Sequence, residues 1–271
     1  MTTDAGLFGP GSVTWRVSRE AVLLAGGGRA LLLQVAHPSV AAGVVQHSDY
    51  DVDPYGRLFR TLDLVTKITF GRGATSEKAA RTLRHAHDDV RGERPDGERY
   101  FAHDPKLLLW VWATLVETSV LVYTRYVGPL AVSEVERFYV EQQRFGEACG
   151  IPSDTFPEDW RTFVRWYHRM LDDECTVSDD SRRIGASVVD PSVPGLLRPA
   201  AKPAALLLNL ATVGLLPPQV RARYGYTWGP HRERVLGAST VAIRRLLPLL
   251  PSLVRELPPA RSAEHRVGAV A

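Results

Sequence analysis

Two Asp-Pro pairs, each at the start of a long predicted helix, constrain the fold of this chain more than any other feature. The pair at residues 53–54 places an N-cap residue before a proline in the first helical position. The run that follows continues to Phe70 and stops at Gly71, which suits the position after a helix end. The pair at 104–105 repeats the arrangement before an apolar helix that reaches about Tyr126. Since strand signals are few, we predict an all-α fold.

Further helix boundaries are marked along the rest of the chain. We predict one helix from Ser76 to Gly92, and another that opens with a capping box of Ser133 and Glu136 and ends at Gly150. The remaining predicted helices are Glu158–Leu171, Asp179–Val189, Ala200–Leu216 and Arg232–Leu247.

Three consecutive glycines at 26–28 lie between two predicted helices. No strand precedes them and neither GxGxxG nor GxxxxGK[ST] is present, so phosphate binding is poorly supported. We interpret them as a break between helices or a close approach of two backbones. The chain has no internal repeat and no linker rich in Gly, Ser or Pro. We therefore predict a single domain over residues 1–271, with a core from about 15 to 258 and a polar, frayed tail after Pro258.

Composition excludes several classes of protein. The chain is 45% hydrophobic and 23% charged, which is enough for a buried core without disulfides or structural metals. Its net charge of +3 is spread without a run of like charges, so we expect no nucleic-acid partner. Cys149 and Cys175 are far apart in sequence and belong to no metal-spaced pair, which favours two reduced, buried thiols.

No secretion or twin-arginine signal is visible at the start of the sequence, so we expect a cytoplasmic protein. The most apolar stretch, Ala204–Leu216, is bracketed by prolines and is too short to span a bilayer. We expect no transmembrane segment and interpret this stretch as a core helix. The alternative is a helix at a membrane surface, which would give weak membrane association.

His87 is the most interesting of eight histidines. In the predicted helix from Ser76 to Gly92 it shares a face with Leu83 and Val90, at the spacing of a buried stripe. His85, two residues away, points to the opposite, charged side. We therefore expect His87 to point inward and His85 outward. An inward histidine is either a hydrogen-bonded core residue or a ligand.

The preceding predicted helix carries Arg57, Arg60 and Thr61 beside an apolar face. Two cations there need an anionic partner. One of the nearby residues Asp51, Asp53 and Asp63 could serve, which would make the arrangement structural. A cofactor with carboxylates is the functional alternative, because the guanidinium fork holds carboxylates through two hydrogen bonds.

Three further polar residues are candidates. Glu117 lies in the apolar helix after residue 104, and it either pairs with an arginine or holds the free nitrogen of an iron-binding histidine. His37 precedes a proline and His47 ends a predicted helix; both are weaker ligand candidates. His103 is expected at the surface. HExxH and GxSxG motifs are absent, so zinc hydrolases and serine hydrolases are poorly supported.

Three blocks in order resemble the catalytic domain of the MpaB-like and rubber-oxygenase family, which includes latex-clearing protein. They are ALLLQVAHPSVAAGVVQHSDYDVDPYGRLFRTL, AHDDVRG and DPKLLLWVWATLVETSVL. The resemblance spans roughly Trp15 to Pro258. It implies an all-helical, globin-like core that holds haem b.

The resemblance also implies roles for individual residues. The proximal iron ligand of the family falls on His87, and the conserved Arg and Thr near the haem fall on Arg57 and Thr61. Arg60 stands where latex-clearing protein has a lysine that can cap the iron, and an arginine is a poor iron ligand. Many relatives carry a histidine in the block where this chain has Trp112.

The leading hypothesis is a haem b-dependent oxygenase that uses dioxygen on a hydrophobic or small-metabolite substrate, by C=C cleavage or by hydroxylation. A second hypothesis is a non-catalytic haem protein for binding or gas sensing, with His37 or His47 as second iron ligand. A third is a haem-free helical scaffold in which His87 is a core residue.

Overall fold

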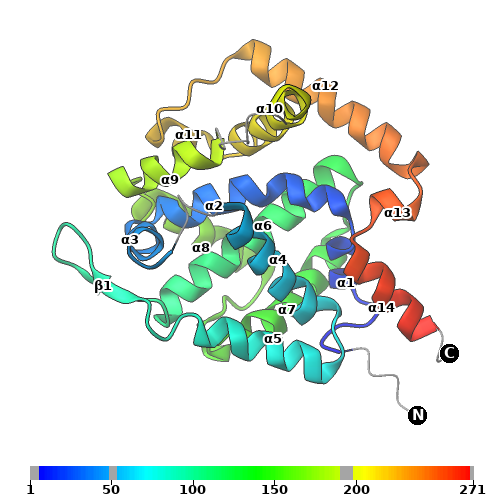
Figure 1. Cartoon of the computed structure of the whole chain (residues 1–271), viewed down its shortest axis with the longest axis horizontal. Coiled ribbons are helices and arrows are strands. Elements are labelled where there is room, and N and C mark those ends of the chain that lie inside the picture. The colour runs from blue at the N-terminus through cyan, green and yellow to red at the C-terminus, as the bar shows by residue number, and fades with distance from the viewer. Residues whose placement is uncertain (1–5, 49–53, 190–197, 269–271) are drawn as a thin grey trace.

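A computed structural model describes residues 6–48, 54–189 and 198–268. These residues form 14 α-helices, three short 3-10 helices and one two-stranded hairpin (Figure 1), so the all-α prediction is confirmed. The elements are α1 Val13–Ser18, η1 Ala21–Gly26, α2 Gly27–Ala36, α3 Pro38–His47, α4 Pro54–Phe70, α5 Gly73–His85, β1 Arg91–Glu93, β2 Arg99–Phe101, α6 Pro105–Tyr126, α7 Val132–Ala148, η2 Ser153–Thr155, α8 Trp160–Asp173, α9 Asp179–Val189, α10 Arg198–Gly214, α11 Pro218–Arg223, α12 Pro230–Leu246, η3 Leu247–Leu249, α13 Ser252–Arg255 and α14 Pro258–Gly268.

The bounds of α4, α6 and α9 agree with the predicted helices to within a residue or two at each end. At the start of α6, the Asp104 carboxylate accepts a hydrogen bond of 2.8 Å from the backbone N–H of Lys106. The N-cap and the first-turn proline therefore act as the sequence indicates. The other predicted cap, Asp53, lies outside the described residues.

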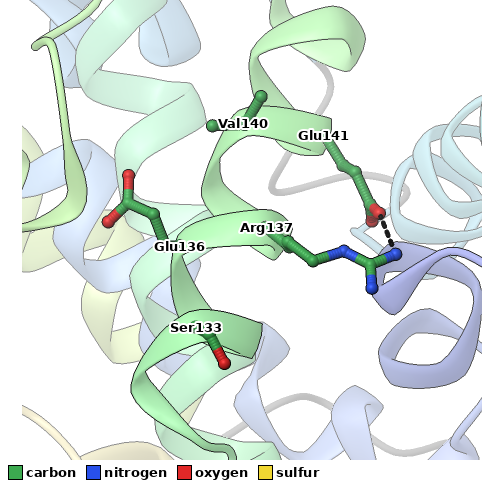
Figure 2. Close-up of a pocket in the computed structure, with 5 residues that line it drawn as sticks. All are labelled: Ser133, Glu136, Arg137, Val140 and Glu141. Atoms are coloured by element: carbon green, nitrogen blue, oxygen red, sulfur yellow. Dashed lines mark ion pairs between the residues drawn. The ribbon is translucent and has the colours of Figure 1, made fainter.

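Helix α7 begins two residues earlier than predicted. At its start the Glu134 carboxylate accepts a 2.8 Å hydrogen bond from the Ala131 N–H, but Ala131 has no side-chain acceptor to complete a capping box. The predicted pair of Ser133 and Glu136 is wrong, because Glu136 instead accepts from the N–H of Trp160 at the start of α8. The outer side of α7 bears a shallow hollow, shown in Figure 2. Its lining is Ser133, Glu136, Arg137, Val140 and Glu141.

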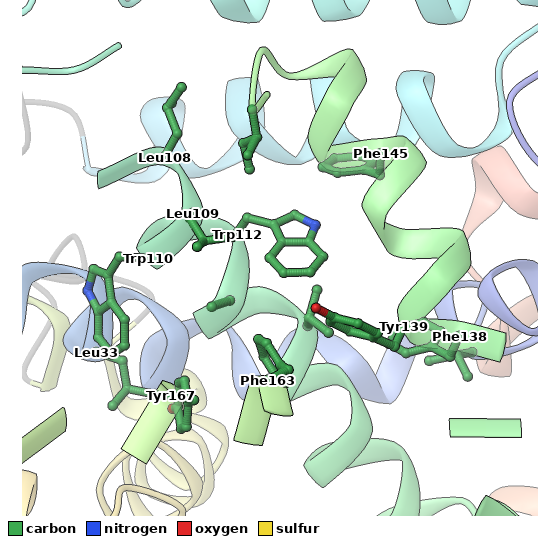
Figure 3. Close-up of a cluster of buried hydrophobic side chains, with 14 of the residues drawn as sticks. Leu33, Leu108, Leu109, Trp110, Trp112, Phe138, Tyr139, Phe145, Phe163 and Tyr167 are labelled. Atoms are coloured by element: carbon green, nitrogen blue, oxygen red, sulfur yellow. The ribbon is translucent and has the colours of Figure 1, made fainter. Parts of the chain in front are cut away.

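Helix α6 runs through the centre of the molecule and supplies much of the core. Figure 3 shows Trp110 and Trp112 of α6 among aromatic rings of α7 and α8. Trp110 stacks on Tyr167 at 5.6 Å between ring centroids, and Trp112 meets Phe163 edge to face at 5.8 Å. Such pairs add about 0.5–1.5 kcal/mol each beyond the area that they bury.

By length and composition α6 could also cross a membrane, but 56% of its apolar stretch is buried inside the protein. It therefore has the environment of a core helix. The predicted helix Ala200–Leu216 corresponds to α10, which ends at Gly214. Leu206 within α10 is exposed, whereas Leu215 and Leu216, directly after it, are buried.

The glycines at 26–28 mark the junction of η1 and α2, and two of them face other helices closely. A Cβ on Gly26 would lie 2.6 Å from Cγ2 of Thr118 on α6, and one on Gly28 would overlap the side chain of Thr212 on α10. The interpretation as a break between helices is confirmed, whereas the close approach is to side chains of α6 and α10 and not between two backbones.

Helix α5 ends at His85, so the predicted helix to Gly92 is wrong in its last two turns, about seven residues. A turn over residues 86–89 follows, and then the antiparallel hairpin of β1 and β2, in which Arg91 pairs with Phe101. The hairpin reverses at Gly97, whose φ of +87° suits glycine. Its Pro-Asp-Gly sequence is a turn signal that outweighs the helical periodicity.

The C-terminal tail is not frayed in the described residues, contrary to expectation. Residues Pro258–Gly268 form α14, which packs beside α4 (Figure 1). Ala260 and Ala263 are fully buried, and the Arg266 guanidinium donates a 2.6 Å hydrogen bond to the carbonyl of Phe70. The segment is polar overall, but its small apolar residues recur at helical spacing and give it one buried side.

Candidate functional site

His87 lies in the turn after α5, where the helix gives way to the hairpin (Figure 1). The expected contrast with its neighbour is present, although the helix ends before it: His87 is half-buried, whereas the His85 side chain is 76% exposed. The Nδ1 atom of His87 is buried and has no hydrogen-bond partner among the described residues. A buried polar atom without a partner is rare, and it marks a position where a ligand can bind.

The surroundings of the His87 ring keep it neutral. Burial lowers its pKa below the usual value, and neighbouring His103 lowers it further, while Asp88 opposes the shift. Neutral imidazole has a lone pair available, which is the form that binds iron.

Two residues beside His87 escaped the sequence prediction. His103 meets the His87 ring edge to face at 6.0 Å, and its Nε2 lies 2.8 Å from Oδ1 of Asp88. The other oxygen of Asp88 lies 2.9 Å from Nδ1 of His85. These hydrogen bonds, first from His85 and then from His103, lower the pKa of Asp88. The turn signal at residues 95–97 could have revealed this pairing, because a hairpin brings residue 103 back beside residue 88.

Helix α4 packs along α5 and carries the predicted Arg57, Arg60 and Thr61. Arg60 and Thr61 are exposed, and the side chain of Arg57 is outside the described part of the structure. Of the aspartates considered as partners, Asp63 pairs with Lys67 at 2.6 Å, and Asp51 and Asp53 lie outside the described residues.

Glu117 pairs with an arginine, as one of its two interpretations predicted. Its Oε2 lies 2.5 Å from Nη1 of Arg29, and it accepts a 3.3 Å hydrogen bond from the Tyr167 hydroxyl. Arg29 also donates to the Leu215 carbonyl at 2.7 Å and to the hydroxyl of Thr118. This buried network joins α2, α6, α8 and the end of α10, which is a structural role.

His37 and His47 are both engaged by protein groups. His37 caps α3, since its Nδ1 accepts from the Ser39 N–H at 3.2 Å, and its Nε2 lies 4.0 Å from Glu174. Burial lowers the pKa of His37. The Nε2 of His47 lies 3.0 Å from the Arg91 carbonyl, so the ring N–H donates to it.

Other parts of the described structure are weaker candidates for a functional site. The hollow on α7 in Figure 2 holds no histidine, and its Arg137 and Glu141 are 3.7 Å apart in an ion pair. Trp112 is buried, and its indole N–H donates to the Gln142 carbonyl at 3.0 Å. No group of three or more His, Cys, Asp and Glu side chains that could hold a metal ion occurs among the described residues. A haem iron takes its equatorial ligands from the porphyrin, so it needs only one or two protein ligands.

Comparison with known proteins decides the family. The family model described as "ER-bound oxygenase mpaB/B'/Rubber oxygenase, catalytic domain" matches residues 15–246. The chain belongs to this family. The MpaB/rubber-oxygenase match thus leaves out only residues 1–14 and 247–271. Membership supports oxygenase activity in general. The resemblance seen in the sequence is confirmed.

Two curated relatives of this MpaB/rubber-oxygenase chain are uncharacterized proteins of Mycobacterium bovis and Mycobacterium tuberculosis. Each is 29% identical over 211 residues, which is 75% of this chain and 80% of the relative. No solved structure matches the chain.

Proposed function

We propose that this protein is a haem b-dependent oxygenase in which His87 holds the iron. The observation that carries the proposal is the buried Nδ1 of His87, which has no hydrogen-bond partner within the described ranges, in a ring that its surroundings keep neutral. A core histidine with a purely structural role would satisfy its ring nitrogens with protein groups, as His37 does through Ser39. His87 would therefore hold the haem iron, and the haem when bound would supply iron able to activate dioxygen.

Helix α4 would supply the polar side of the same site. Arg57 and Arg60 would bind the haem carboxylates, and Arg57 and Thr61 would donate hydrogen bonds toward the oxygen substrate. Arg60 retains its proton and is a poor iron ligand, so its role would be to bind the haem carboxylates and not the iron.

The substrate we propose is a hydrophobic or small-metabolite molecule, cleaved at a C=C bond or hydroxylated, and the compartment is the cytoplasm. Family membership supports an oxygenase acting on a small molecule. Cys149 and Cys175 are both free, and burial raises the pKa of each thiol to about 12, which suits reduced thiols in a reducing compartment.

The arrangement favours an oxygenase over a non-catalytic haem protein. A six-coordinate iron would need His37 or His47 as its second ligand. His37 already caps α3 and His47 already donates to the Arg91 carbonyl, so each would have to give up a protein contact.

Absorption spectra test the proposal. The purified protein, supplemented with haem, should show a Soret band that is lost in His87→Ala and retained in His85→Ala, a matched control two residues away with an exposed ring. Carbon monoxide should bind the reduced wild-type protein. A Soret band that survives in His87→Ala would refute the role of His87, and no Soret band in the wild type would refute haem binding.

A further inference from the structure

The end of α12, the turn η3 and the short helix α13 form a corner whose leucines face solvent. We define the apolar corner by five exposed side chains, of which Leu249 is 78% exposed and Leu253 is 69% exposed. The set is Leu246, Leu249, Leu250, Leu253 and Val254. Several exposed large apolar side chains in so short a segment are a feature of interaction sites.

Buried contacts and hydrogen bonds to the N-terminal segment fix the position of the corner. Leu247 turns inward and is buried, and the Arg255 guanidinium makes two hydrogen bonds of 2.8 and 2.9 Å to the carboxylate of Glu20. The backbone N–H of Leu257 donates to the Arg19 carbonyl at 2.8 Å. Two prolines, Pro248 and Pro251, interrupt the helices and set the angle of the corner. These contacts fix the backbone that carries the leucines, and the segment between α12 and α13 lies at the outer edge of the molecule (Figure 1).

The charged side chains of the segment that forms the corner are all basic, and of these Arg255 is paired with Glu20. The sequence from Arg234 to Arg255 contains four arginines and no acidic residue. Arg244 and Arg245, directly before the corner, are exposed and form no ion pair within the described part of the chain. The acid that follows, Glu256, is buried beside Arg19 at 3.7 Å.

We propose that the apolar corner docks on the surface of a lipid bilayer that contains anionic lipids. Leucines would enter the boundary between headgroups and acyl chains, while Arg244 and Arg245 would bind lipid phosphates. Exposed apolar side chains flanked by unpaired arginines are complementary to such a surface. They are less suited to a second copy of the chain, because a two-fold interface across this corner would bring the arginines of both copies together.

A neighbouring helix adds exposed apolar area. Leu206, Leu207 and Leu208 of α10 are 71%, 54% and 47% exposed, and α10 packs against α12. The proposal concerns a surface outside the His87 site and does not depend on haem binding.

Vesicle flotation of the full-length protein tests the proposal. One set of vesicles is phosphatidylcholine alone, and the other is an equimolar mixture of phosphatidylcholine and phosphatidylglycerol. We expect wild-type protein to float with the mixed vesicles and to bind neutral vesicles at least about tenfold more weakly. Arg244→Gln with Arg245→Gln should weaken binding to mixed vesicles by about 25-fold, at about fivefold per arginine. Leu249→Ser with Leu253→Ser should weaken it by at least about tenfold.

Two control variants make the same kinds of substitution on other surfaces of the protein. Arg161→Gln with Arg169→Gln removes two exposed arginines from α8, and Val132→Ser with Val140→Ser removes two exposed apolar side chains from α7. Both should float like wild type. Failure of the wild type to float, equal binding to both kinds of vesicle, or an equal loss in the controls would overturn the proposal. The proposal would also be overturned if the wild-type protein does not float but is a dimer in light scattering, and Leu249→Ser with Leu253→Ser makes it a monomer.

Discussion

Arg29 and Glu117 meet in the interior at 2.5 Å between Nη1 and Oε2, with the Arg29 side chain only 2% exposed. The pair joins α2 to the central helix α6. Because it lies in the interior, removing one member leaves the opposite charge buried without its partner. We expect Glu117→Leu to lower the free energy of unfolding by about 3–5 kcal/mol, measured by urea denaturation.

The double variant Arg29→Met with Glu117→Leu shows whether the loss of stability comes from an unpaired buried charge or from lost packing. Replacing both charges with apolar groups of similar size should recover much of the stability that the single variant loses. Tyr167→Phe, which removes only the 3.3 Å hydrogen bond to Glu117, should cost about 1 kcal/mol. A Glu117→Leu protein as stable as wild type would show that the pair contributes nothing to the fold.

The buried imidazole of His87 makes the stability of the haem-free protein depend on pH. Its pKa is lowered by burial, so the unfolded chain binds a proton near pH 6.5 that the folded chain excludes. Its contribution to stability is therefore complete above about pH 6.5 and is lost as the pH falls toward the lowered pKa, by at most about 1.4 kcal/mol per pH unit. His87→Gln should reduce this slope in urea titrations between about pH 8 and about pH 5.

A slope remains in that variant, because the pKa of His37 is lowered by burial as well. His85→Gln is the matched control, since the exposed ring of His85 should leave the slope unchanged. If the His85 and His87 variants behave alike, the ring of His87 is not buried in solution.

The docking of α14 can be tested at two adjacent residues. Ala263 is fully buried and Ser262 is exposed. Ala263→Asp should lower the thermal midpoint and cost at least about 1–3 kcal/mol from overpacking alone, whereas Ser262→Asp should have little effect. Equal midpoints for the two variants would mean that this segment is frayed, as its composition suggests.

Local signals in the sequence predicted most helices well, and long-range contacts account for the errors. The boundaries of α4 and α6 follow from caps and prolines that act within a few residues. The end of α5 was misplaced because Val90 continues the apolar period past His85, while the hairpin that competes for those residues depends on pairing with residues 99–101.

In the candidate site, too, features set by local sequence could be predicted, whereas contacts between distant residues could not. The contrast in burial between His85 and His87 is local and was foreseen, but His103 reaches His87 only through the hairpin. The partner of Glu117 was foreseen as an arginine, but its identity was not, since Arg29 is 88 residues away in sequence. No sequence pattern distinguishes one distant arginine from another.

The three glycines at the junction of η1 and α2 offer a comparison within one helix turn. A methyl group on Gly26 would lie 2.6 Å from Thr118 and 2.8 Å from Val122, whereas a methyl group on Gly27 meets nothing within 4 Å. Gly26→Ala should therefore cost about 1–3 kcal/mol, because α6 must shift away from the junction. Gly27→Ala should stabilise the protein by about 0.5–1 kcal/mol, since Gly27 already has helical backbone angles.

Thermal and urea unfolding of the two variants measure the difference directly. Gly28→Ala should resemble Gly26→Ala, because its methyl group would overlap the side chain of Thr212 on α10. Gly28→Ala with Thr212→Ser should recover part of the loss, since serine lacks one of the crowded atoms. If all three glycines tolerate alanine equally, α2 does not approach α6 and α10 as closely as the structure shows, and the frame around Arg29 is looser than its hydrogen bonds imply.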